Sequence, residues 1–215
     1  WWLNLTLSDL FDKACDLYPR KEAIVDGNSR YTYAELKETV ENMAVGFLQN
    51  GIGPGDRVML QLPNCAEFVF VYYALQKIGA VPLVLVPRHN YHEISHLCKL
   101  IGARGWVLPW RYGKIQYEEL IEDVKKDNPQ LARIFIHGEG GSKETSPLET
   151  MVESVDAGTA EPVDLSKYKP DPLAVCTIIP TGGTTGFPKA VPRTHECYFN
   201  NAEYLAKAYE LNSLD

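Results

Sequence analysis

Patterns typical of helices and of strands alternate along almost the whole of this 215-residue sequence. The strand patterns are short and continuously apolar, as in VPLVLVP at 81–87. Such runs are typical of parallel sheets, whose two faces are both covered. Because parallel strands need crossover connections, usually helices, the alternation predicts βαβ units. The expected fold class is therefore α/β, with a mostly parallel sheet flanked by helices.

Periodicity and capping signals give the expected elements. Thr32 with Glu35, and Asn64 with Glu67, have the spacing of a capping box at a helix start. Helices are expected at residues 7–19, 32–52, 64–80, 91–103, 117–127 and 195–211. Two short strands are expected around a turn at 26–28, and further strands at residues 56–63, 81–87, 104–109, 132–138, 173–180 and 189–194.

Residues 138–172 break the alternation. They are rich in Gly, Ser, Pro and acidic residues, which is typical of an irregular surface segment, here around one short helix. Such a segment could link two domains. A strand pattern resumes directly after it, so we interpret it as a long connection within one domain.

Charge limits the possible partners. The formal net charge of −7 argues against a broad surface for nucleic acid or anionic membranes. The longest apolar runs, such as residues 68–75, are too short to cross a bilayer. We therefore expect neither nucleic-acid nor membrane partners.

The five cysteines are widely spaced and form no C-x-x-C pair, so we interpret them as scattered thiols in a reducing cytoplasm rather than as disulfides or a zinc site.

The segment IIPTGGTTGFPKAVPRTH, residues 178–195, gives the clearest functional signal. Glycines let a ligand approach the backbone N–H groups closely. The hydroxyls of Thr181, Thr184 and Thr185 add hydrogen-bond donors, and Lys189 adds a point charge suited to phosphate. Placed in a loop between two strands, these residues predict a polyphosphate site. A mobile surface loop with incidental threonines is the alternative that the residues alone leave open.

Two common phosphate motifs do not fit this segment. In the P-loop, a Gly-Lys pair leads directly into a helix. Here Pro188 precedes the lysine, Ala190 follows it, and a strand-like stretch comes next. The glycines stand at 182, 183 and 186, which does not match G-x-G-x-x-G.

TGGTTGFPKAV, residues 181–191, resembles the phosphate-binding signature of the adenylate-forming superfamily. That superfamily includes acyl-CoA synthetases, peptide-synthetase adenylation domains and beetle luciferases. Ala190 stands where the family most often has glycine, which affects backbone packing and not the phosphate contacts. RYTYAEL, GIGPGDRVMLQLPNCAEF and ALQKIGAVPLVLVP also resemble family segments, so the likeness covers the whole chain.

Within the superfamily, PKAVPRTH and VPRHNYHEI are most similar to the aryl-acid branch. That branch includes 2,3-dihydroxybenzoate–AMP ligases of siderophore biosynthesis. The resemblance implies a ligase in which a carboxylate attacks the α-phosphorus of Mg²⁺-bound ATP, giving an acyl-adenylate and pyrophosphate. A thiol of coenzyme A, or of phosphopantetheine on an aryl carrier protein, then accepts the acyl group.

The resemblance also implies which residues bind the β- and γ-phosphates. Carried over to this sequence, they are Thr181, Gly182, Gly183, Thr184, Thr185, Gly186, Phe187, Pro188 and Lys189. No catalytic residue and no metal ligand is expected in this chain. His92 and His96 are four residues apart and could share a metal, but no third ligand is evident, and a surface cluster is the preferred interpretation.

Members of the superfamily are much longer than this sequence. The resemblance therefore implies that residues 1–215 are the N-terminal fragment of the large adenylation domain, without the C-terminal lid domain. We expect the fragment itself to be inactive. Two alternatives stay open: a truncated non-catalytic module that binds a nucleotide or a partner, and a fragment of an acyl- or aryl-CoA ligase.

Overall fold

The computed structural model describes residues 4–152, 163–183 and 186–211. Its central sheet has seven strands. They are β3 (Arg57–Leu60), β4 (Val81–Val84), β5 (Gly105–Pro109), β8 (Arg133–His137), β9 (Ser146–Pro147), β10 (Val175–Gly183) and β11 (Gly186–Thr194). The strand order is β11-β10-β4-β3-β5-β8-β9, and all neighbours are parallel except β10 and β11. The predicted mostly parallel α/β sheet is confirmed.

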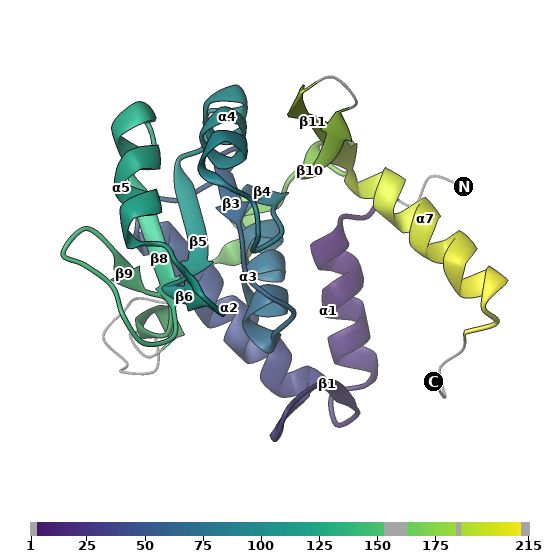
Figure 1. Ribbon diagram of the computed structural model, residues 1–215. Coiled ribbons are helices and arrows are strands. Elements are labelled where there is room, and N and C mark those ends of the chain that lie inside the picture. Colours follow the sequence, from purple (N-terminus) through teal and green to yellow (C-terminus); the bar gives the residue numbers. More distant parts are fainter. Residues whose placement is uncertain (1–3, 153–162, 184–185, 212–215) are drawn as a thin grey trace.

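Helices cover both faces of the sheet (Figure 1). One hydrophobic core contains side chains of α1 (Leu7–Leu17), α2 (Tyr33–Gln49) and α3 (Ala66–Lys77). The other contains side chains of α4 (Tyr91–Ile101) and α5 (Glu118–Asp127). These five helices begin and end within a few residues of the predicted bounds. In amphipathic helices such as α1 and α5, an apolar stripe and a polar face give a clear signal.

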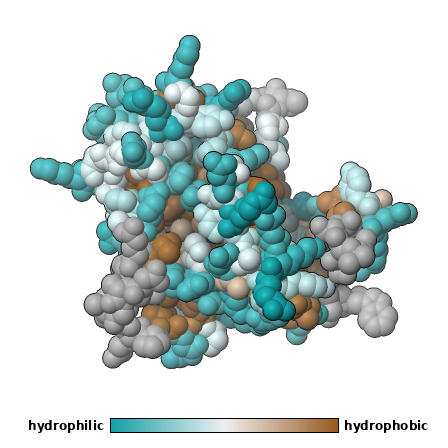
Figure 2. Space-filling view, turned by 90° about the horizontal axis from the view of Figure 1, so that it is seen from below, coloured by the Kyte–Doolittle hydropathy of each residue, from teal (hydrophilic) through white to brown (hydrophobic). Residues whose placement is uncertain are grey.

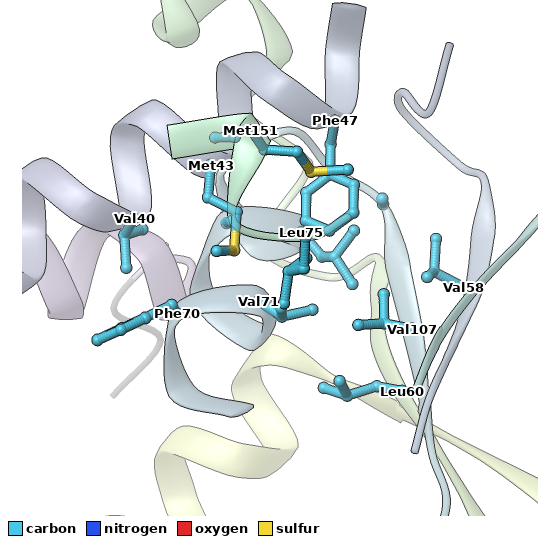
Figure 3. Close-up of a cluster of buried hydrophobic side chains, with 14 of the residues drawn as sticks. Val40, Met43, Phe47, Val58, Leu60, Phe70, Val71, Leu75, Val107 and Met151 are labelled. Atoms are coloured by element: carbon cyan, nitrogen blue, oxygen red, sulfur yellow. The ribbon is translucent and has the colours of Figure 1, made fainter. Parts of the chain in front are cut away.

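Strand side chains alternate between the two cores. In β3, Val58 and Leu60 belong to the core of α2 and α3, whereas Met59 belongs to the core of α4 and α5. Figure 3 shows Val58 and Leu60 on the side of the sheet that faces Phe47 and Leu75. Because successive side chains of a strand point to opposite faces, a strand covered on both faces needs a continuous apolar run.

Several short elements add to this framework. β1 (Glu22–Asp26) and β2 (Ser29–Thr32) form the predicted hairpin, while β6 (Arg111–Tyr112) and β7 (Ile115–Gln116) form a second one that was not predicted. β9 and the 3-10 helix η1 (Leu165–Tyr168) lie within the stretch that was expected to be irregular. Strands of two residues are too short for a periodic signal, which explains why β6, β7 and β9 were missed.

One of the two predicted capping boxes is confirmed. At the start of α2 the reciprocal hydrogen bonds are 2.8 and 3.3 Å long. The second box, Asn64 with Glu67, is wrong, because α3 has Cys65 at its N-cap and no side-chain cap hydrogen bond there. Instead, the Ala66 N–H donates to Asp26 Oδ2 at 2.9 Å. A carboxylate from the neighbouring hairpin therefore satisfies a donor at this helix start.

α7 (His195–Ala208) extends away from the sheet beside α1 (Figure 1). Its outer half is exposed, and Tyr204 and Tyr209 keep 72% and 73% of their surface accessible. On the face seen in Figure 2, apolar side chains reach the surface in separate patches among hydrophilic ones. In the described ranges, no helix combines the length and the apolar character that crossing a membrane requires.

Candidate phosphate-binding hairpin

The glycine-rich segment forms the end of the antiparallel hairpin of β10 and β11. β10 continues to Gly183 and β11 starts at Gly186, so the structure has strands where a long loop was expected. We call residues 180–190 the glycine hairpin. Thr184 and Thr185, two of the predicted phosphate-binding residues, lie outside the described residues. The predicted loop is longer than the observed one. The antiparallel pairing of β10 and β11 continues into the glycine-rich segment once the register of the two strands is set.

Thr181 and Lys189 are direct partners across this hairpin. Both residues are exposed. Side chains directly opposite each other in an antiparallel pair lie on the same face of the sheet. The hydroxyl and the ammonium group therefore share one exposed face. Among the described residues, no acidic side chain forms an ion pair with Lys189.

Two glycines of the hairpin differ in what they require. Gly186 has φ of +127°, a backbone conformation that favours glycine. Gly182 has no positive φ, and a Cβ built on it would meet no atom within 4 Å. Packing within the described chain therefore does not require glycine at 182. The open space beside its backbone is accessible to a ligand.

The hairpin is attached to α4 through β11. The ring of Phe187 stacks on the imidazole of His96, with centroids 4.8 Å apart and planes 22° from parallel. Pro188 is buried, and Ala190 packs against the core of α4 and α5. These contacts hold the strand that carries Lys189 while leaving the lysine itself exposed.

The chain leaves the hairpin through a fixed helix start. Thr194 caps α7, and its Oγ1 accepts a hydrogen bond of 3.3 Å from the Cys197 N–H. His195 is buried, and its Nδ1 accepts from the Leu7 N–H at 3.0 Å. Burial lowers the pKa of His195 to about 4, against smaller opposing effects of Asp9 and Asp171. The neutral imidazole therefore joins the starts of α7 and α1.

An apolar groove of about 430 Å³ lies beside β10 and was not predicted. Its walls come from α1, α3, β4, β10 and α7, and include Phe68, Tyr72, Tyr73, Val84, Ile179 and Tyr198. The groove has no cation among these residues, so it does not offer phosphate chemistry. No local sequence signal could have found it, because its walls come from elements far apart in the sequence.

The arrangement of the glycine hairpin favours binding of an extended anion. A lysine ammonium, a threonine hydroxyl and an open glycine backbone occur together on one exposed end of the sheet. Such groups position a polyphosphate and offset its charge. The structure thus brings seven of the predicted residues into one hairpin rather than a loop: Thr181, Gly182, Gly183, Gly186, Phe187, Pro188 and Lys189.

Comparison with known proteins gives a family match over most of the chain. Residues 11–214 match the family model described as AMP-binding enzyme. A 2,3-dihydroxybenzoate-AMP ligase of Bacillus subtilis is 35% identical over 214 residues, which are all of this chain and 37% of the ligase. A salicyl-AMP ligase / salicyl-S-ArCP synthetase of Mycobacterium tuberculosis is 31% identical over 221 residues, covering 100% of this chain and 38% of that protein.

A solved structure supports the same relationship. The apo structure of MbtA from Mycobacterium smegmatis superposes with a TM-score of 0.86 at 31% sequence identity. The match covers 99% of this chain and 38% of the MbtA chain. This chain thus spans well under half the length of the curated relatives that it matches. Because the family model covers residues 11–214, the chain belongs to the AMP-binding enzyme family.

Proposed function

We propose that the glycine hairpin binds the β- and γ-phosphates of ATP. The observation that carries this proposal is the pairing of Thr181 with Lys189 on an exposed face, beside the open backbone of Gly182. The Lys189 ammonium offsets phosphate charge, and the Thr181 hydroxyl donates a hydrogen bond. Gly182 lets a phosphate oxygen come close to the main chain.

The other hairpin residues complete the proposed site. Thr184 and Thr185 add hydroxyl donors, and Gly183 and Gly186 add accessible backbone. Phe187 and Pro188 hold β11 against the rest of the fold, which supports a positioning role for them. The proposed nucleotide-binding set is therefore Thr181, Gly182, Gly183, Thr184, Thr185, Gly186, Phe187, Pro188 and Lys189.

The donor groups of the hairpin do not suit direct binding of Mg²⁺. Residues 175–194 contain no Asp or Glu, and Mg²⁺ prefers carboxylates, phosphates and water. We therefore propose that Mg²⁺ is held by the phosphates of ATP. When bound, the ion would neutralise charge on the phosphate oxygens. Lys189 would add a fixed charge beside them.

We propose that the parent protein activates a carboxylic acid. The acid oxygen attacks the α-phosphorus, the acyl-adenylate forms, and pyrophosphate leaves. An aryl acid is the proposed substrate class, because relatives that match the whole chain are named for 2,3-dihydroxybenzoate and salicylate. The acyl group is then transferred to a thiol, either that of coenzyme A or that of phosphopantetheine on an aryl carrier protein. From these relatives we also propose a role in siderophore biosynthesis.

We further propose that the chain is the N-terminal part of the large adenylation domain of such an enzyme. It spans 37% of the 2,3-dihydroxybenzoate-AMP ligase that it matches. The exposed outer half of α7, with Tyr204, Leu205 and Tyr209, supports packing against further chain. A cytoplasmic location is supported by five cysteines that form no disulfide.

ATP–pyrophosphate exchange in the complete enzyme tests this proposal. Exchange should depend on an aryl acid, with 2,3-dihydroxybenzoate, salicylate and benzoate compared against a fatty acid. Acyl transfer should then be compared between coenzyme A and a phosphopantetheinylated carrier protein. Binding of ATP without exchange for any acid would indicate a non-catalytic nucleotide-binding module and contradict the ligase function.

A further inference from the structure

A cluster of side chains that are potential metal ligands lies at the carboxyl ends of parallel strands, away from the glycine hairpin. Cys65 and Glu67 follow β3 at the start of α3, and His137 is the last residue of β8. One ligand atom of each residue lies within 4.8 Å of those of the other two. All three side chains are partly accessible to solvent.

A fourth side chain orients the histidine of this cluster. His137 Nδ1 lies 2.9 Å from Glu149 Oε1, which also accepts from the Gly138 N–H at 2.9 Å. A carboxylate acceptor at this distance favours the tautomer with hydrogen on Nδ1, so that the Nε2 lone pair is free. Nε2 of His137 lies 3.7 Å from Glu67 Oε2 and therefore faces the other members of the cluster.

We propose that Cys65, Glu67 and His137 form a Zn²⁺ site. A thiolate, an imidazole and a carboxylate are the three donor types that zinc takes in proteins. Cys65 would lose its proton to solvent on binding, and water would fill the fourth tetrahedral position. Glu149 would act as the outer carboxylate that fixes the ring of a metal-bound histidine.

The composition of the cluster separates it from an ordinary group of surface charges. It combines three chemically different donors from two strand ends that are distant in sequence, and it has a dedicated partner on the histidine. The His92 and His96 pair of α4 offers no comparable set among the described residues, and His96 stacks on Phe187 instead. The proposed zinc site does not depend on the nucleotide function.

Cobalt substitution of the 215-residue chain gives a direct test. Co²⁺ should bind one equivalent and produce the near-ultraviolet charge-transfer band of a thiolate ligand, and one equivalent of Zn²⁺ should remove that band. Cys65→Ser should abolish the band, and His137→Gln should weaken Co²⁺ binding at least tenfold. Glu149→Gln, which removes the outer carboxylate, should weaken binding by about 10- to 100-fold.

Matched variants control for other thiols and histidines. Cys197→Ser changes the other half-buried cysteine, and His92→Gln changes an exposed histidine of the α4 pair. Neither should alter the band or the affinity. Binding without a thiolate band, or binding that survives Cys65→Ser and is lost in His92→Gln, would contradict the proposal.

A measurement on the unmodified chain removes the risk that a variant fails to fold. Alkylation of each cysteine by N-ethylmaleimide can be followed by mass spectrometry of the peptides. Stoichiometric Zn²⁺ should slow labelling of Cys65 at least tenfold and leave the rate at Cys197 unchanged. Equal rates at Cys65 with and without Zn²⁺ would overturn the site.

Discussion

Thr181 pairs directly with Lys189 across the antiparallel hairpin of β10 and β11. Their side chains therefore share one face, although eight positions separate them in the sequence. The same hairpin carries Gly182, whose missing Cβ leaves open space beside the backbone. Packing among the described residues does not account for a glycine at 182, so variants at this position test ligand binding separately from folding.

Gly182→Ala should affect ATP and not stability. The added methyl meets no atom within 4 Å in the chain, so we expect the free energy of unfolding to change by less than about 0.5 kcal/mol. If a phosphate approaches this backbone, the methyl should weaken ATP binding at least tenfold. Urea unfolding and titration calorimetry on one preparation give both quantities.

Gly186→Ala is the matched control for that experiment. Its φ of +127° strains any residue with a Cβ, and we expect a loss of stability of about 1–3 kcal/mol. Loss of stability in Gly182→Ala, with ATP affinity unchanged, would contradict the assigned roles.

The stack of Phe187 on His96 should couple the hairpin to α4. Phe187 keeps 60% of its surface exposed, so the interaction is expected at the low end of the range for ring pairs, about 0.5 kcal/mol. A double-mutant cycle of Phe187→Ala and His96→Ala in urea measures it. The same cycle with His92→Ala, a residue outside the stack, should give no coupling. Equal values in both cycles would mean that the stack contributes nothing.

His195 should make the fold sensitive to acid. Above pH 6.5 the imidazole is neutral in both the folded and the unfolded chain. Below pH 6.5, His195 is protonated in the unfolded chain, whereas in the folded chain it stays neutral until the pH approaches its pKa of about 4. Because the unfolded chain binds the additional proton, the free energy of unfolding falls between pH 6.5 and 4. The lowered pKa of His195 corresponds to a loss of roughly 3 kcal/mol in the free energy of unfolding by the time the pH reaches 4.

Unfolding free energies of the wild type and of His195→Asn isolate that contribution. The Asn carbonyl can still accept from the Leu7 N–H but does not titrate, so the variant should lose less stability as the pH falls. His92→Asn, an exposed residue, should behave like the wild type. Identical pH dependence of the wild type and His195→Asn would contradict the prediction.

The sequence predicted the sheet well because burial on both faces leaves a local signature. Val81–Val84 and Gly105–Pro109 are continuously apolar, and α4, a helix with an apolar stripe, separates them. The position of β9 could not be predicted, because two residues give no period. The capping box predicted at the start of α3 is absent for a tertiary reason. Asp26, which is distant in sequence but adjacent in space, supplies the acceptor for the Ala66 N–H.

The sequence predicted which residues make up the candidate site but not how they are arranged in space. Residue types at 181–189 indicated phosphate binding, but the pairing of Thr181 with Lys189 depends on the register of the hairpin. The contact of Phe187 with His96 joins two separate elements. The cluster of Cys65 with His137 likewise forms only when β3 and β8 enter one sheet, so no local motif indicated it.

If Lys189 binds the β- and γ-phosphates of ATP, the two half-reactions of the complete enzyme should respond differently to its loss. A charge-assisted hydrogen bond contributes roughly 1.5–3 kcal/mol, so Lys189→Ala should lower ATP–pyrophosphate exchange by about 10- to 100-fold. Transfer from a preformed acyl-adenylate, which has no β- or γ-phosphate, should stay nearly unchanged. Lys189→Arg should restore exchange only in part, since a planar guanidinium does not replace a point charge. Equal losses in both half-reactions, or unchanged exchange, would show that Lys189 does not bind these phosphates.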